Sequence, residues 1–217
     1  AGAVLHTDAV QAAGKLALDF AAGGAGLMTL SAHKINGPKG VGALIMDKAL
    51  DVEPLQYGGQ QERARRPGTE NVAGIVGFGQ AAELADSGLE ERGAAMARLR
   101  DRLEHGLAQL PGVTRFGAGA PRVPNTSFFG VAGIDGETLL MNLDGAGIAV
   151  SSGSACESGS TEPSHVLVAM GAEEQAARGA VRVSFGQGNS EADVDALLAA
   201  LRQQIEFIQS LSGLVSV

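Results

Sequence analysis

Short apolar segments alternate with segments of helical pattern along this chain, and this alternation constrains its fold more than any other feature. Strand candidates in the first part are 1–5, 27–30 and 41–46, and helix candidates are 9–17, 71–86 and 90–110. Strands that are separated by helices usually form a parallel sheet. We therefore predict an α/β fold with a mainly parallel sheet, whose first strand is buried and ends in His6-Thr7-Asp8.

The pattern changes after the helix stop at Pro111-Gly112. Strand candidates there are 113–116, 126–129, 148–151 and 181–185, and helices are expected at 136–143 and 164–170. A last helix opens with Ser190 as its N-cap, and Asp193 follows three residues later, close to a capping box. We predict that residues 1–89 form the end of a larger domain and that residues 90–217 form a small α+β domain.

Charge, hydropathy and cysteine content narrow the class of protein. The net charge of −8 argues against a nucleic-acid binder, and no apolar stretch reaches the roughly 20 residues of a membrane helix. The single cysteine forms no internal disulfide, and C-x-x-C metal spacing is absent, so we predict no metal site. The low cysteine content leads us to expect a reducing, cytoplasmic-type setting. We also expect a fragment of a longer protein, because the first strand resembles a strand from the middle of a fold.

That cysteine, Cys156, lies in a run of small residues, SSGSACESGS, at 151–160. A free cysteine is most often buried and inert. Its serine and glycine neighbours suit a loop, however, and loops carry functional groups disproportionately. Cys156 is therefore a candidate nucleophile, with an inert thiol as the alternative.

A lysine and an aspartate follow two strands of the predicted sheet. Lys34 lies in the run SAHKINGPKG at 31–40, and Asp8 follows the first strand. In a parallel sheet both would lie at carboxyl ends, where open α/β sheets bind ligands. A carboxylate beside a lysine suits pyridoxal phosphate, whose phosphate Ser31 and His33 could bind. The plainer alternatives are a capping aspartate and a solvated lysine.

Arginines mark two further places. Three of them, within residues 63–66, precede Thr69 and the expected helix, where free backbone N–H groups favour an anion. A solvated basic loop is the alternative there. Arg182 lies within the apolar strand candidate 181–185, so we interpret it as buried. A buried arginine needs an anion, either a substrate carboxylate or a structural ion-pair partner.

Together these motifs resemble the cysteine desulfurases of the NifS/IscS-like group, in the class V aminotransferase superfamily with PLP fold type I. The similarity runs from Leu5 to about Leu211. The segments that carry it are 31–34 (SAHK), 37–40 (GPKG), 66–69 (RPGT), 151–156 (SSGSAC) and 162–167 (EPSHVL).

The resemblance implies a role for each residue around the cofactor. Lys34 would carry pyridoxal 5'-phosphate as a Schiff base and then shuttle protons. Asp8 would pair with the pyridinium nitrogen, and Gln11 would donate a hydrogen bond to the ring's phenolic oxygen. Ser31 and His33 would bind the phosphate.

The resemblance also implies roles in binding and sulfur transfer. In a homodimer, Thr69 would reach the phosphate of the other subunit. Arg182 would hold the carboxylate of the L-cysteine substrate. Cys156 would take the sulfur as a persulfide, leaving L-alanine, and would pass it to a sulfur-acceptor protein for iron–sulfur cluster assembly or thiolation.

One departure from the family is large. The first half of such enzymes supplies another phosphate-binding loop and a histidine that stacks on the ring, and neither has a counterpart here. We expect a polypeptide that supplies this N-terminal half, and poor cofactor binding by residues 1–217 alone. A selenocysteine lyase or other PLP-dependent C–S lyase, and a catalytically silent sulfur-relay or docking fragment, remain as alternatives.

Overall fold

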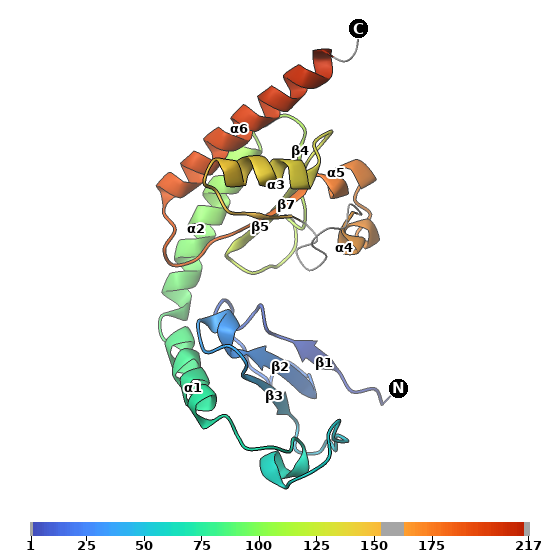
Figure 1. Ribbon diagram of the computed structural model, residues 1–217, viewed down its shortest axis with the longest axis vertical. Coiled ribbons are helices and arrows are strands. Elements are labelled where there is room, and N and C mark those ends of the chain that lie inside the picture. The colour runs from blue at the N-terminus through green and yellow to red at the C-terminus, as the bar shows by residue number, and fades with distance from the viewer. Residues whose placement is uncertain (1, 153–162, 215–217) are drawn as a thin grey trace. The chain divides into compact units, whose positions relative to one another are not determined.

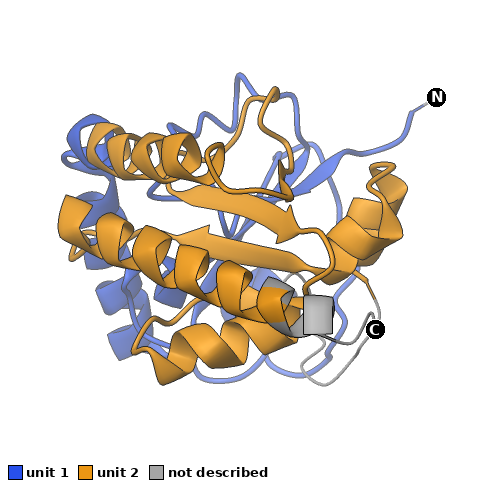
Figure 2. Cartoon of the chain, turned by 90° about the horizontal axis from the view of Figure 1, so that it is seen from above, with its two compact units in different colours: residues 1–92 blue, residues 93–217 orange. Residues whose placement is uncertain are grey.

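The chain forms two compact units, residues 1–92 and 93–217, in a computed structural model that describes residues 2–152 and 163–214 (Figures 1 and 2). Both units combine helices with a β-sheet, which confirms the α/β class. Among the described residues, no helix is both long and apolar enough to cross a lipid bilayer.

Unit 1 contains a three-stranded sheet in the order β1-β2-β3 (Figure 1). β1 (His6–Asp8) and β2 (Leu27–Ser31) are parallel, and β3 (Gly42–Met46) is antiparallel to β2. The expectation of a mainly parallel sheet therefore holds only for the first pair. The β2–β3 connection, residues 32–41, is shorter than the dozen or so residues that a parallel crossover needs.

The start of the chain also differs from the prediction. Residues 2–5 are exposed and lie outside the strand, which begins at His6. The helix expected at 9–17 is a series of turns, in which the N–H of Ala13 bonds to the carbonyl of Ala9. Gly14 has a φ of 70°. A residue in this left-handed region cannot continue a right-handed helix.

Helix α1 (Val72–Asp86) begins where the sequence predicts it. Asn71 caps its N-terminus, and the Asn71 Oδ1 accepts a hydrogen bond of 3.1 Å from the N–H of Gly74. The helix contacts the short 3-10 helix η1 (Ala32–Ile35). At Gly77 an added Cβ would lie 2.6 Å from the Cγ of Pro38. Gly77 therefore allows α1 to pack closely on the segment after η1.

Unit 2 is built on a four-stranded antiparallel sheet in the order β4-β5-β7-β6. Its strands are β4 (Val113–Arg115), β5 (Thr126–Val131), β6 (Ser151–Ser152) and β7 (Ala180–Ser184). Its helices are α3 (Gly136–Gly145), α4 (His165–Ala169), α5 (Glu174–Arg178) and α6 (Glu191–Leu214), together with most of α2 (Leu89–Leu107). Helix α5 does not correspond to any helix expected from the sequence pattern.

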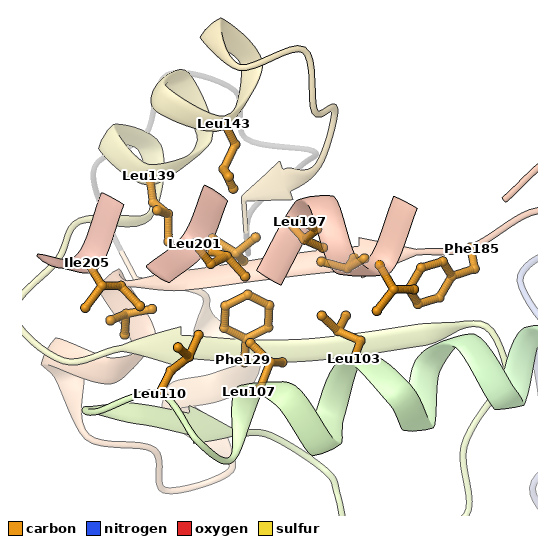
Figure 3. Close-up of a cluster of buried hydrophobic side chains, with 14 of the residues drawn as sticks. Leu103, Leu107, Leu110, Phe129, Leu139, Leu143, Phe185, Leu197, Leu201 and Ile205 are labelled. Atoms are coloured by element: carbon orange, nitrogen blue, oxygen red, sulfur yellow. The ribbon is translucent and has the colours of Figure 1, made fainter. Parts of the chain in front are cut away.

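The core of unit 2 lies between its helices and its sheet (Figure 3). Leu103 of α2, Phe129 of β5 and Leu201 of α6 are fully buried there. One of the two hydrogen bonds of a capping box is present before α6, since Asp193 Oδ2 accepts a hydrogen bond of 2.8 Å from the Ser190 N–H. This cap lets α6 begin at a defined residue and present its apolar face to the core.

Candidate active site

The carboxyl ends of two parallel strands bring the predicted cofactor residues to one edge of the unit 1 sheet. Asp8 ends β1, Ser31 ends β2, and Asp8 pairs with Thr29 of β2. Lys34 follows in η1, and both the Asp8 and the Lys34 side chains are exposed. This edge of a parallel pair is where α/β proteins bind ligands.

Ser31 and His33 lie together beside Lys34. The Oγ of Ser31 and the Nδ1 of His33 share a hydrogen bond of 2.8 Å. His33 is exposed and Ser31 is partly buried. Either group can donate a hydrogen bond to a phosphate, so their chemistry and position fit the predicted role.

Asp8 also has a local structural role. Its Oδ1 accepts a hydrogen bond of 2.9 Å from the N–H of Val10. This is the capping role that the sequence also allowed for Asp8. The bond holds the carboxylate at the start of the turns that contain Gln11. Since Oδ2 takes no part in this bond, capping and binding of a ring nitrogen are chemically compatible.

Gln11 is exposed and is joined to a lysine that the sequence analysis did not single out. The Nζ of Lys15 donates hydrogen bonds to the main-chain carbonyl of Gln11 at 3.0 Å and to its Oε1 at 3.2 Å. Burial lowers the pKa of Lys15, and the positive charge of Lys34 lowers it further. The spacing of four residues between Gln11 and Lys15 could have indicated this contact from the sequence.

The loop before α1 exposes Thr69 two residues ahead of the cap residue Asn71. Gly68 has a φ of 99°, and its N–H donates a hydrogen bond of 3.2 Å to the Oε1 of Gln61. Gln61 begins the 3-10 helix η2 (Gln61–Ala64). The turn at 66–69 therefore requires glycine at position 68 and leaves the Thr69 side chain accessible to a ligand.

Arg182 lies in unit 2, and the expectation that it is buried is wrong. In β7 the side chains of Val181 and Val183 are buried, whereas Arg182 is exposed. Successive side chains of a strand point to opposite faces, which explains the alternation. Arg182 pairs with Phe128 of β5 and with Ser151 of β6, the first residue of the run at 151–160. Cys156 itself lies outside the described residues.

The side chains at the edge of the unit 1 sheet fit the groups of pyridoxal phosphate. They offer a primary amine for a Schiff base at Lys34 and a carboxylate for the ring nitrogen at Asp8. They also offer an amide at Gln11 and a hydroxyl beside an imidazole at Ser31 and His33. This is the set of donors and acceptors that a phosphorylated pyridine aldehyde requires.

A family model for class-V aminotransferases matches residues 1–197. The chain belongs to the class-V aminotransferase family. Among curated relatives, a cysteine desulfurase of Gluconacetobacter diazotrophicus is 47% identical over 98% of this chain and 53% of its own length. An IscS-like cysteine desulfurase of Mycobacterium tuberculosis is 48% identical over 92% of this chain and 51% of its own length. The chain thus spans about half the length of these relatives.

Solved structures of NifS-like proteins show the same fold. A NifS-like protein from Rickettsia africae matches with a TM-score of 0.85 and 33% identity, covering 94% of this chain and 54% of its own. A second NifS-like protein matches with a TM-score of 0.83 and 38% identity, covering 94% and 52%. The predicted resemblance to the NifS/IscS-like group and its PLP fold type I is confirmed, and this family depends on pyridoxal phosphate.

Proposed function

We propose that this chain is part of a PLP-dependent cysteine desulfurase that converts L-cysteine to L-alanine and transfers the sulfur to Cys156. One observation carries the proposal: Asp8 and Lys34 lie at the carboxyl-end edge of the parallel pair β1–β2. Two curated relatives named as cysteine desulfurases, 47% and 48% identical to this chain, support the same activity.

At that edge, each residue has a chemical task. When bound, pyridoxal phosphate supplies an electron sink for the substrate carbon atoms. Lys34 would hold it through Nζ and, once displaced by substrate, would move protons with the same amine. Asp8 would keep the ring nitrogen protonated, because a carboxylate stabilises a neighbouring cation.

Phosphate and substrate would be held by further side chains. Ser31 and His33 would donate hydrogen bonds to the phosphate, and Thr69 would reach the phosphate of the other subunit in a homodimer. Arg182 would bind the substrate carboxylate, because a guanidinium can donate two parallel hydrogen bonds to it. Its exposed position in β7 leaves it accessible to such an anion.

Sulfur transfer would take place at Cys156. Its thiolate would attack the substrate sulfur, so that an S–S bond forms while the carbon–sulfur bond breaks. The carbon would leave with the electron pair and take up a proton, giving L-alanine. The persulfide would then pass to a sulfur-acceptor protein for iron–sulfur cluster assembly or thiolation, in a cytoplasmic setting.

The test measures L-alanine and protein persulfide in the assembly of this chain with the polypeptide that supplies the N-terminal half. Cys156→Ser should reduce persulfide to background, because the accepting thiol is lost. Lys34→Ala should remove both products, and Lys48→Ala, at an exposed lysine outside the site, should retain both. Undiminished persulfide in Cys156→Ser would disprove this mechanism.

The same assembly separates the two alternatives. Faster turnover of L-selenocysteine than of L-cysteine would favour a selenocysteine lyase. Sulfur that still reaches the acceptor in the Lys34→Ala variant would favour a relay fragment, since a relay needs no Schiff-base lysine.

A further inference from the structure

The contact between Lys15 and Gln11 determines which end of the Gln11 amide is free. Lys15 Nζ lies 3.2 Å from Gln11 Oε1 and 3.0 Å from the Gln11 main-chain carbonyl oxygen. A lysine ammonium has three N–H donors and no acceptor, so only the oxygen of the amide can face it. The Nε2 group of Gln11 then points away from Lys15 as a pure hydrogen-bond donor.

Packing holds this contact against η1. Lys15 is partly buried, and this burial lowers its pKa. At Gly14 an added Cβ would lie 3.1 Å from the Cγ2 of Ile35, so the turn that carries Lys15 lies against the residue next to Lys34. The charge of Lys34 acts on Lys15 as well, which places the two lysines in one electrostatic environment.

We propose that Lys15 is a positioning residue that orients Gln11, so that the Gln11 amide N–H groups face an oxyanion of the bound ligand. The proposal rests on the proposed function and on the role that the family resemblance implies for Gln11, in which this oxyanion is the phenolic oxygen of pyridoxal phosphate. Without the ammonium, the amide can turn over and present its own oxygen, which repels an oxyanion. Lys15 thus acts through Gln11 and need not touch the ligand.

The first test needs no cofactor. In the 15N-labelled chain, the two side-chain amide protons of Gln11 should resonate away from the positions of a free glutamine, because Lys15 holds the amide oxygen. Lys15→Met, which keeps an unbranched side chain without the charge, should shift these signals toward those of a free glutamine. Lys15→Arg should retain them, because a guanidinium also only donates. Free-glutamine signals in the unmodified chain would overturn the proposal.

The second test measures selectivity for the oxyanion. Dissociation constants are compared for pyridoxal 5'-phosphate and its 3-deoxy analogue, which lacks the phenolic oxygen. Lys15→Met should lower the preference for the phenolic compound about fivefold, the size of one net hydrogen bond, and Lys15→Arg should restore it. In a Gln11→Ala background, Lys15→Met should cause no further change in that preference.

Lys48→Met is the matched control, because it removes an exposed positive charge elsewhere in unit 1 and should leave the preference unchanged. If Lys15→Met weakens the binding of both compounds equally, in the unmodified chain and in the Gln11→Ala background, Lys15 has only a general charge effect. That result would overturn the proposal. Failure of the proposed function would look different from failure of this proposal. In that case the assembly would make no L-alanine, although the Gln11 amide is ordered.

Discussion

At the scale of single residues, Glu104 of α2 shows how unit 2 tolerates a buried charge. Its side chain is buried, and its two oxygens accept hydrogen bonds of 2.6 and 2.8 Å from Arg122. Arg115 adds an ion pair at 3.3 Å. The hydrogen bonds from Arg122 lower the pKa of Glu104, although burial acts in the opposite direction. The carboxylate is therefore stable only together with its arginine partners.

Replacing Glu104 by Gln should destabilise the protein by about 2 kcal/mol, because the partly buried Arg122 loses its counter-ion. Glu174→Gln is the control: Glu174 pairs with Arg178 at 2.8 Å on the surface, where such pairs contribute only about 0.5 kcal/mol or less. Urea unfolding followed by circular dichroism measures both. Equal losses in the two variants would contradict the role given to Glu104.

The same variant should change the pH dependence of stability. Because the folded-state pKa of Glu104 is lowered, its contribution is complete above the unfolded pKa of about 4.3 and is lost as pH falls through the folded value. The difference in unfolding free energy between the unmodified chain and Glu104→Gln should therefore shrink below about pH 4. A constant difference from pH 7 to pH 3 would argue against this linkage.

At the scale of elements, two glycines of helix α1 have different surroundings. A Cβ at Gly77 would meet the Cγ of Pro38 at 2.6 Å and its Cδ at 3.1 Å. A Cβ at Gly79 would meet no heavy atom within 4 Å among the neighbours that the structure describes. Close packing therefore explains Gly77, and nothing in the structure explains Gly79.

These two positions form a matched pair of substitutions. Gly79→Ala should stabilise the chain by about 0.5–1 kcal/mol, because alanine loses less backbone freedom in a helix. Gly77→Ala should destabilise it by about 1 kcal/mol, because the overlap with the rigid Pro38 ring outweighs the same gain. Thermal unfolding of both variants checks the opposite signs, and stabilisation by both would show that Pro38 moves aside easily.

At the scale of the whole molecule, the cofactor residues of unit 1 are open to solvent. Asp8, Gln11 and Lys34 are all exposed. Water competes for such groups and weakens each polar contact with a ligand. The relatives that match this chain are about twice as long.

We therefore predict that the 217-residue chain binds pyridoxal phosphate weakly by itself, with a dissociation constant at least about tenfold higher than that of the assembly with an N-terminal half. Titration of the Schiff-base absorbance measures both constants, and Lys34→Ala gives the background. Strong absorbance from the chain alone at low micromolar cofactor would show that residues 1–217 suffice.

The motifs and helix ends of this chain were predictable because the interactions that produce them are local. The cap at Ser190 and Asp193, for example, joins residues three positions apart. The helix predicted at 9–17 is wrong, because the periodic pattern does not reveal the positive φ of Gly14. Strand alternation, a rule of period two, could also have placed Arg182 on the exposed face. The sequence therefore determined the α/β class, the position of Lys34 after a strand and the start of α6.

The way in which these pieces combine depends on contacts that form only in the folded chain. The antiparallel return of β3 and the close approach of Gly77 to Pro38 depend on contacts between distant segments. The orientation of Gln11 by Lys15 depends on a turn that is held against η1. Local propensity carries little information on such contacts, because their free energy comes from burial and pairing that exist only once the chain has folded.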